Sequence, residues 1–283
     1  MAIDLVTKFL PYVDEQFTTE SKKSLITNQD FQWTGAHTVK IYKISTAAMH
    51  DYGRGGPASG NWSCFGPLDA LDAATEDLTL RKDRSFIFPV DKLDTDETAQ
   101  QLSAASALAR QVREKVIPEV DAYTCEIMCE KAGTKPAAVA LTEDNLYTEI
   151  LKATETMDNA EVPEQGRVLI VTPSTYALMK KCRDIILESD VGNELRLRGV
   201  IGLLDGMAVQ KVPSSRLPEE FGFMAVHPIA TVAPTKLEDY QIHNNTIYNS
   251  GAVVTGRICY DAFVLDNKAK AIYYQAVPAE AGE

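Results

Sequence analysis

The longest regular pattern of apolar and polar residues in the chain runs from Asp94 to Gly133. Apolar residues recur there at steps of three or four, which places them on one face of a helix. They are Leu102, Ala105, Ala109, Val112, Val116, Val120, Tyr123 and Ile127. Asp94 or Thr95 can cap the first turn, and Gly133 can take the left-handed conformation that ends a helix. The pattern predicts a helix over 95–132, about 57 Å long at 1.5 Å per residue.

Pro118 interrupts this stretch. A proline removes one backbone hydrogen bond and crowds the carbonyl of Glu114, so it can divide the stretch into two ordinary helices or bend a single one. The apolar stripe keeps its phase across Pro118 and no turn residues flank it, which favours one kinked helix. Such a helix would span a compact chain of this length, roughly 50 Å across. A long helix outside a globular core suggests a protein built to lie against copies of itself.

Alternating apolar and polar residues predict strands before this helix. The first begins at His37, in HTVKIYKI, and the second is RSFIFPVD, from Arg84 to Asp91. Between them, the segment DYGRGGPASGNWSCFGP holds five of the sixteen glycines, with Trp62 and Phe65 among them. Loops this long are usually functional or disordered, and exposed aromatic rings need a cover. We expect a neighbouring subunit to cover them; a flexible surface loop is the alternative.

The middle of the chain alternates between helix and strand signals. TEDNLYTEILKATETM predicts a helix that Thr142 can cap, and RVLIVTP predicts a short buried strand. STYALMKKC follows directly as a second helix, with Ser174 placed to cap it. Further strands are predicted over 207–212 and 221–232. This order predicts a small α/β domain.

The region from Gly251 to Val277 contains strand signals alone. VVTGRICYDAFVL and KAKAIYYQAV predict a long hairpin, with Asp266-Asn267 as its two-residue turn. These strands can return to the sheet that begins at His37, which would make the α/β region an insertion between early and late strands.

Composition and charge narrow the class of protein. The net charge of −12 argues against broad electrostatic attraction to nucleic acid, and it keeps a dense assembly soluble. The five cysteines are odd in number and scattered, which indicates a reducing compartment. Neither a secretory signal nor a run of 18 apolar residues is visible. We therefore expect a soluble protein made in the cytoplasm.

Candidate catalytic chemistry is sparse. The motifs G-x-S-x-G, G-x-x-x-x-G-K-[ST] and H-E-x-x-H do not occur in the sequence. Gly199, Gly202 and Gly206 resemble a dinucleotide loop only loosely, because they precede a predicted strand instead of following one. Cys125 and Cys129 share a helix face, where burial of small thiols is commoner than metal binding. The histidines lie in four separate segments: His37, His50, His227 and His243.

A second candidate site is the acidic run before the long helix. Asp91, Asp94, Asp96 and Glu97 have the oxygen ligands that a hard cation prefers. The positive end of the helix dipole already accounts for acidic residues in that place. We therefore predict no catalytic residue, no cofactor site and no metal site.

The order of the predicted elements, together with several sequence phrases, resembles one family closely. It is the major capsid proteins of tailed double-stranded DNA bacteriophages, whose α+β architecture, the Johnson fold, is shared with encapsulin nanocompartments. The resemblance covers nearly the whole chain and depends on the sum and order of the phrases, none of which is a catalytic signature. They are WTGAHTVKIYKI, HDYGR, DRSFIFPVDKLDTDET, REKVIPEVDAY, RVLIVTPSTYALMKK, GVIGLLDGMAVQKVP and GRICYDAFVLDNKAKAIYY.

The resemblance implies a division of the chain into the parts that this family has. An N-arm would take residues 1–36, and a first part of the peripheral P-domain would take 37–136. That part would include an extended E-loop hairpin over 45–84 and the spine helix over 95–132. The axial A-domain would take 137–245, and 246–283 would return to the P-domain.

The resemblance also implies a function. The chain would have no enzymatic activity and would self-assemble, as pentamers and hexamers, into the icosahedral shell of a virion. That shell would enclose double-stranded DNA without sequence-specific binding and without a membrane, after assembly in the cytoplasm of the host bacterium. Scaffolding, portal and decoration proteins would be further partners. The residues expected at contacts between subunits are Tyr52, Arg54, Trp62 and Phe65 in the loop, and Phe9 and Phe17 in the arm.

Two alternatives and one variation remain open. An encapsulin-type shell would use the same fold, and a cytosolic α/β enzyme with a mobile lid at 45–84 would belong to a different class. Some capsid proteins also join subunits by a Lys–Asn isopeptide bond. Lys82 lies near the end of the loop, but no matching Asn or Glu is found, so we expect no cross-link.

Overall fold

The computed structural model describes residues 23–28, 38–56, 62–71, 73–92, 103–182, 185, 202–244 and 250–278. The chain forms two compact units. We call Trp33–Leu80 the hairpin unit, and Met1–Gln32 with Arg81–Glu283 the body. Most of the predicted N-arm, including Phe9 and Phe17, lies outside the described residues. In the part that is described, no helix is both long and apolar enough to cross a bilayer.

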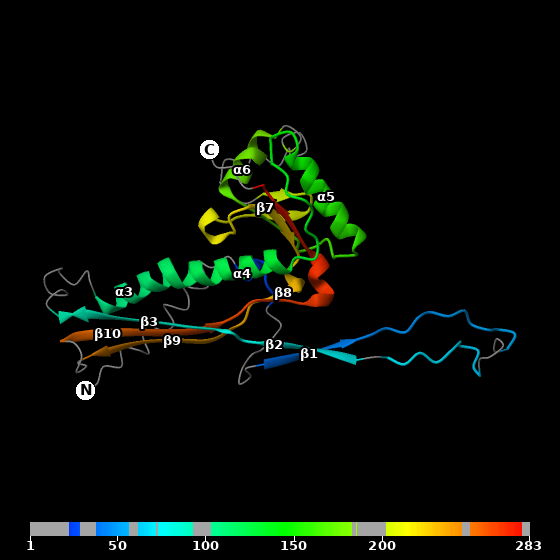
Figure 1. Ribbon diagram of the computed structural model, residues 1–283, viewed down its shortest axis with the longest axis horizontal. Helices are drawn as coiled ribbons and strands as arrows, with labels where there is room; N and C mark the ends of the chain where they lie inside the picture. The colour runs from blue at the N-terminus through cyan, green and yellow to red at the C-terminus, as the bar shows by residue number, and fades with distance from the viewer. Residues whose placement is uncertain are drawn as a thin grey trace. The chain divides into compact units, whose positions relative to one another are not determined.

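The hairpin unit contains two strands. β1 (Thr38–Ile44) runs antiparallel to β2 (Ala73–Thr79), with Thr38 opposite Thr79 and Ile44 opposite Ala73 (Figure 1). Lys43 and Glu76 form an ion pair across the strands at 2.9 Å. The strand predicted from His37 is therefore confirmed. The expectation that it would share a sheet with the strand at 84–91 and the C-terminal strands is wrong, because a nearer strand that the sequence did not reveal, β2, takes its hydrogen bonds.

The body contains a three-stranded antiparallel sheet in the order β3-β10-β9. Its strands are β3 (Lys82–Asp91), β10 (Gly251–Tyr260) and β9 (Thr235–Asn244). Gly251 lies opposite Asp91 and Tyr260 lies opposite Lys82. The early and late parts of the chain thus meet in one sheet, as expected, with β3 as the early strand.

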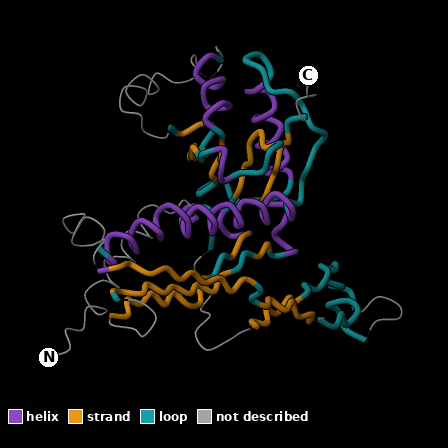
Figure 2. The backbone as a smooth tube through the Cα atoms, turned by 60° about the vertical axis from the view of Figure 1, so that its left-hand side comes forward, coloured by secondary structure: helices purple, strands orange, loops and turns teal. Residues whose placement is uncertain are grey.

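A single helical rod packs on this sheet (Figures 1 and 2). It consists of α3 (Ala104–Gln111), a π-helical turn η2 (Val112–Val116) and α4 (Ile117–Lys131). The backbone stays in the right-handed helical region through both junctions, so one helix passes through Pro118 as predicted. Within the π-helical turn the hydrogen-bond ladder shifts, and the Ile117 N–H bonds the Val112 carbonyl five residues back. This shift accommodates the proline.

The ends of the rod differ from the prediction. Ser103 has extended backbone angles, and its hydroxyl accepts a hydrogen bond from the Ser106 N–H, so the helix begins at Ala104 and not at residue 95. The predicted caps Asp94 and Thr95 lie outside the described residues. At the other end Ala132 leaves the helix with φ −56° and ψ 133°, without a left-handed glycine. Gly133 serves close approach instead, because a Cβ there would lie 2.5 Å from the carbonyl carbon of Ala269.

An apolar cluster joins the rod to the sheet. The rod contributes apolar residues from one side of the helix, and the strands contribute the residues that point toward the rod. The buried members are Val90, Leu108, Val112, Val116, Ile117, Val120, Tyr240, Val254, Ile258 and Tyr260. Val112, Val116 and Val120 of the predicted stripe therefore pack on the sheet, with Tyr123 partly buried beside them. Ala105 and Ala109 do not belong to this cluster, and Ile127 packs against a different one.

The second sheet of the body has five strands in the order β12-β7-β4-β6-β5. The strands are β4 (Val168–Val171), β5 (Leu203–Leu204), β6 (Met207–Lys211), β7 (Phe221–Val226) and β12 (Ile272–Ala276). β4 and β6 are parallel, and the other pairs are antiparallel. Asp205 and Gly206 have positive φ and form the tight turn between β5 and β6.

Both faces of this sheet are covered, which explains its continuous apolar strands. Leu169 and Val171 point into a cluster with α5 (Leu146–Asn159) and α6 (Pro173–Lys181). Val168 and Ile170 point the other way, into a cluster that includes Cys125, Met128 and Cys129 of α4. The strand predicted at RVLIVTP is therefore a buried strand, as expected.

The predicted C-terminal hairpin is wrong. Asp266–Ala271 forms a 3₁₀-helix, η5, in place of a two-residue turn, and β12 pairs with β7 instead of with β10. Ile272 and Tyr273 are both buried although they point to opposite faces. Such a strand needs a sheet covered on both sides, which the five-stranded sheet provides. The short strands β11 (Phe263–Val264) and β8 (Thr231–Val232) pair with one another.

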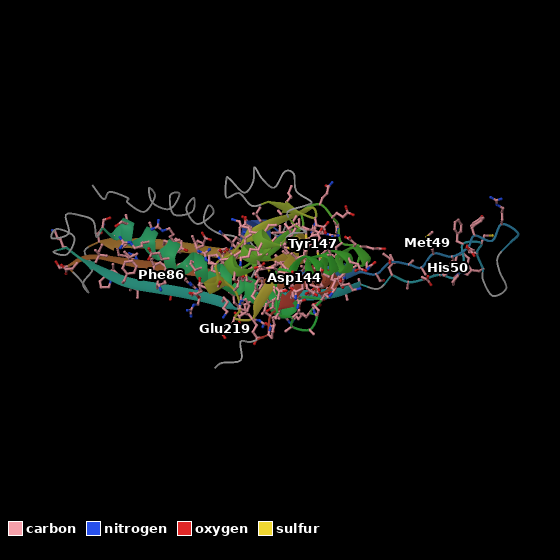
Figure 3. All side chains as sticks on the ribbon, turned by 90° about the horizontal axis from the view of Figure 1, so that it is seen from above. Met49, His50, Phe86, Asp144, Tyr147 and Glu219 are labelled. Atoms are coloured by element: carbon pink, nitrogen blue, oxygen red, sulfur yellow. The ribbon has the colours of Figure 1, made fainter. Side chains whose placement is uncertain are left out.

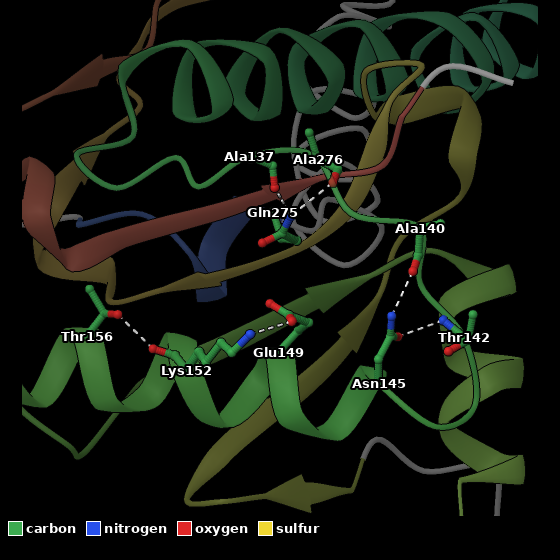
Figure 4. A network of polar contacts seen from close by, with 9 residues as sticks. All are labelled: Ala137, Ala140, Thr142, Asn145, Glu149, Lys152, Thr156, Gln275 and Ala276. Carbon is green, nitrogen blue, oxygen red and sulfur yellow. Dashed lines mark hydrogen bonds and ion pairs between the residues drawn. The ribbon is translucent and has the colours of Figure 1, made fainter. Parts of the chain in front are cut away.

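Two predicted helix caps also shift. α5 begins after Asn145 and not after Thr142. The Asn145 side chain donates from Nδ2 to the Ala140 carbonyl and accepts the Thr142 N–H at Oδ1, each at 2.8 Å (Figure 4). α6 begins after Thr172, whose hydroxyl accepts from the Thr175 N–H, and Pro173 is its first residue. The remaining short 3₁₀-helices are η1 (Lys23–Leu25), η3 (Ser214–Arg216) and η4 (Pro228–Ala230).

Candidate assembly surface

The loop between β1 and β2 presents large apolar side chains to solvent. Six of the ten large apolar side chains that are exposed in the described residues lie between Met49 and Leu71. They are Met49, Tyr52, Trp62, Phe65, Leu68 and Leu71, and we call them the loop surface. The exposed fraction is 79% for Trp62 and 77% for Phe65. A group of exposed apolar side chains of this kind indicates an interaction site.

Contacts inside the loop hold its two sides together. The Gly53 N–H bonds the Cys64 carbonyl at 2.8 Å, and His50 Nε2 lies 3.0 Å from Asp69 Oδ2. Gly66 has a φ of +97°, and a Cβ there would lie 2.8 Å from the Cβ of His50, so glycine is required at this crossing. The described residues of the loop, 45–56 and 62–71, are therefore held in a local structure in which the large apolar side chains are exposed.

The predicted contact residues occupy this loop in different ways. The rings of Tyr52 and Phe65 lie edge to face with centroids 5.1 Å apart, so the fold brings these two residues together. Arg54 and Trp62 lie close to Tyr52 and Phe65 in the sequence, and both side chains are exposed. Phe9 and Phe17 lie outside the described residues.

Sequence reasoning missed three members of the loop surface: Met49, Leu68 and Leu71. Met49 is 97% exposed and lies next to His50 on the loop (Figure 3). Leu68 and Leu71 follow Pro67 in a stretch without helical or strand periodicity. Apolar residues in an aperiodic segment rich in glycine and proline are the signal that identifies all six, because such a segment offers no core of its own.

The candidate chemical groups do not converge. In the described ranges, no group of three or more His, Cys, Asp or Glu side chains is placed to hold a metal ion. Burial raises the pKa of the Cys129 thiol to about 12 and raises that of Cys125 further, which suppresses the thiolate that a metal would need. His227 accepts from the Ile229 N–H, and His243 lies 3.1 Å from Thr255 Oγ1.

The remaining candidates fall at separate places. Gly206 is a turn residue with a φ of +74°, and Gly199 lies outside the described residues, as do Asp94, Asp96 and Glu97 of the acidic run. The ammonium of Lys82, the residue considered for a cross-link, lies 4.8 Å from the centre of the Tyr123 ring.

The described residues thus contain a hairpin with an exposed apolar loop, a helical rod on a three-stranded sheet, and a second sheet covered by helices. Comparison with solved structures identifies the fold. A chain from Mycobacterium phage Che8 is similar with a TM-score of 0.70 and 20% identity, over 90% of each chain. A chain from the capsid of cyanophage P-SCSP1u gives a TM-score of 0.63 at 14% identity, over 90% of this chain and 86% of that one.

A third similar structure is the virus-like particle from Pyrococcus furiosus, with a TM-score of 0.58 and 10% identity, over 96% of this chain and 100% of that one. The chain therefore has the α+β fold of the phage major capsid proteins, as its sequence phrases indicated. No protein-family model and no curated protein matches the sequence. The likeness is one of fold, carried by element order rather than by sequence identity.

Proposed function

We propose that this chain is the major capsid protein of a tailed bacteriophage, whose copies assemble into an icosahedral shell around double-stranded DNA. The observation that carries the proposal is the loop surface on a chain with the capsid fold. Its apolar side chains lie in solvent in the single chain, and a neighbouring copy supplies a cover for them. Pentamers and hexamers in a virion, formed in the host cytoplasm, are the assemblies that such a chain builds.

The parts of the chain take the following roles in this proposal. The E-loop, residues 45–84, lies mostly in the hairpin unit and reaches a neighbouring subunit. The helical rod with the sheet β3-β10-β9 is the P-domain, and the five-stranded sheet with α5 and α6 is the A-domain. Because β12 pairs with β7, residues 272–276 go with the A-domain in this scheme, and β9 goes with the P-domain. Residues 1–36 are the N-arm, and scaffolding, portal and decoration proteins are the further partners.

A substitution at Trp62 tests the loop surface. Because its side chain is 79% exposed, Trp62→Ala leaves the subunit folded, with a melting temperature within about 2 °C of the parent. Truncating a large aromatic anchor at a contact lowers the yield of shells about tenfold or more. Trp62→Phe is the matched control, because it keeps an apolar ring and retains assembly. The readouts are thermal unfolding of the subunit and shell yield by sedimentation and negative-stain microscopy.

The deletion of residues 53–66 is the stronger form of this test. The deleted chain remains a soluble, cooperatively folded subunit but does not form shells. Loss of folded subunit would show that the loop belongs to the core of the protein. Discrete small oligomers from the parent chain, in place of particles tens of nanometres wide, would support the enzyme alternative.

The similarity to a virus-like particle favours a second candidate within the same fold, an encapsulin-type shell. Such a shell holds protein cargo, whereas a phage capsid holds the genome. Particles isolated from the natural source and treated with nuclease distinguish the two. Protected double-stranded DNA supports the capsid, and particles that contain protein cargo and no genome support the encapsulin.

A further inference from the structure

The chain passes from the hairpin unit into the body at Arg81, directly before β3. A buried carboxylate accepts a backbone hydrogen bond at this point. Asp261 is 3% exposed and follows the end of β10, and its Oδ2 accepts the Arg81 N–H at 2.8 Å. Its Oδ1 accepts the Tyr123 O–H and the Ala262 N–H, each at 2.8 Å. One carboxylate therefore joins Arg81, the first residue of the body after the hairpin unit, to the helical rod and to the end of a central strand.

The residues that follow Arg81 attach to the same elements. The ammonium of Lys82 lies over the Tyr123 ring, and Arg84 Nε donates to Glu119 Oε1 at 2.8 Å. The same Glu119 oxygen accepts the Tyr260 O–H at 3.0 Å. We call this set the root cluster. Its members are Arg81, Lys82, Arg84, Glu119, Tyr123, Tyr260 and Asp261.

The two tyrosines of the root cluster act as fixed donors. Their rings lie edge to face with centroids 5.7 Å apart. Burial, and then the hydrogen bond to a carboxylate, raises the pKa of Tyr123 above its ordinary value, and the same causes raise the pKa of Tyr260. Both hydroxyls therefore keep their protons at physiological pH and remain hydrogen-bond donors to the two carboxylates.

The contacts of the root cluster differ in strength. Arg84 and Glu119 are 62% and 46% exposed, and solvent-exposed ion pairs contribute little. Asp261 is buried and accepts three hydrogen bonds, and hydrogen bonds to a buried charged group are the stronger kind. A donor left facing it without an acceptor would also carry a desolvation cost. Asp261 is thus the member whose loss has the largest effect on the backbone at Arg81.

We propose that Asp261 is a positioning residue for assembly: it holds the backbone at Arg81, where the chain leaves the hairpin unit, so that this segment is already ordered when the loop surface meets a neighbouring copy. This inference rests on the proposed function, because it assigns Asp261 to the contact that the loop surface makes. A contact element that is held before binding loses less conformational entropy when it binds. Asp261 itself is buried in the body and does not touch the neighbour; it acts through Arg81.

The substitution Asp261→Asn separates this role from general stability. The asparagine Oδ1 still accepts from Tyr123 and Ala262, but its NH₂ group faces the Arg81 N–H, which leaves two donors in opposition. Amide hydrogen exchange at Arg81, measured by NMR on the unassembled subunit, becomes about tenfold faster or more. Shell yield at a fixed subunit concentration falls severalfold.

Asp83→Asn is the matched control. It makes the same chemical change at the neighbouring end of β3, where Asp83 forms an exposed two-point pair with Arg257 at 3.0 and 2.6 Å. The control leaves Arg81 exchange and shell yield at the parent values. Faster exchange in Asp261→Asn without a loss of shells overturns the positioning role. Equal effects of the two substitutions overturn it as well.

The parent protein alone supplies a further test, in case Asp261→Asn does not fold. The Arg81 amide exchanges at least about tenfold more slowly than the amides of the exposed loop residues 45–52. Equal rates in the parent overturn the proposal. Because exchange is measured before assembly, a slow Arg81 amide in a chain that never forms shells would refute the proposed function while leaving the attachment at the root intact.

Discussion

At the scale of single residues, the packing of the helical rod on its sheet depends on a glycine in the central strand. Gly256 lies between Val254 and Ile258 on the face of β10 that the rod covers. Its cross-strand partners are Phe86 and Tyr240, whose rings stack with centroids 6.0 Å apart. The rings of the two outer strands thus fill the space above the glycine, which gives the sheet a close-packed surface without a side chain at its centre.

The substitution Gly256→Ala is therefore expected to destabilise the body. A Cβ at this position would lie 2.2 Å from Cζ of Phe86, so the ring has to move and its stacks on Phe88 and Tyr240 are disturbed. We expect the free energy of unfolding, measured by urea titration, to fall by about 1–3 kcal/mol. Gly202→Ala is the control, because its Cβ meets open space and a change within about 0.5 kcal/mol is expected. Equal stability of the two variants would contradict this account.

Single residues also explain which parts of the candidate assembly surface could be predicted from the sequence. Trp62 and Phe65 stood out because aromatic residues are conspicuous among glycines. Met49 and Leu68 did not, because an isolated methionine or leucine has the same sequence signature in a core as on a surface. The role of Asp261 could not be predicted from the sequence for a different reason. Its partners, Arg81 and Tyr123, are 180 and 138 positions away, and no local pattern links residues at that distance.

At the scale of elements, periodicity predicted the rod because one of its faces is apolar, and it predicted the buried strands because they are continuous apolar runs. The apolar stripe keeps its phase through Pro118, and a π-helical turn directly before the proline lets one helix continue past it. The start at Ser103 was missed because Asp94, Thr95 and Ser103 are all good caps, and local sequence does not rank them. Strand partners were harder still, since β10 and β12 have similar local patterns and join different sheets.

The placement of β12 leads to a prediction about the C-terminal region. Ile272 is 0% exposed and lies in the cluster on one face of the five-stranded sheet, and Tyr273, 3% exposed, lies in the cluster on the other. A chain that ends at Leu265 would open both clusters and leave β7 unpaired along one edge. We expect it to lose cooperative unfolding, as followed by circular dichroism, and to accumulate in the insoluble fraction. A soluble, cooperatively folding truncated chain would show that β12 is dispensable for the sheet.

At the scale of the whole molecule, the charge of the chain and its apolar loop act in opposite directions. With 40 acidic and 28 basic residues, each copy carries a net charge of −12, so copies repel one another at long range. The loop surface attracts at short range by burying apolar area. Under the proposed function, a shell would form where the short-range contacts exceed the repulsion.

This balance predicts how assembly responds to salt. The screening length falls from about 10 Å at 0.1 M salt to about 3 Å at 1 M, which weakens repulsion between copies and leaves the apolar contacts intact. The subunit concentration at which shells appear, measured by light scattering, should fall severalfold between about 50 and 500 mM NaCl. Trp62→Phe should follow the parent, and Trp62→Ala should stay unassembled at the same concentrations throughout. A threshold that rises with salt would mean that pairs of opposite charge, and not the loop surface, dominate the contacts between subunits.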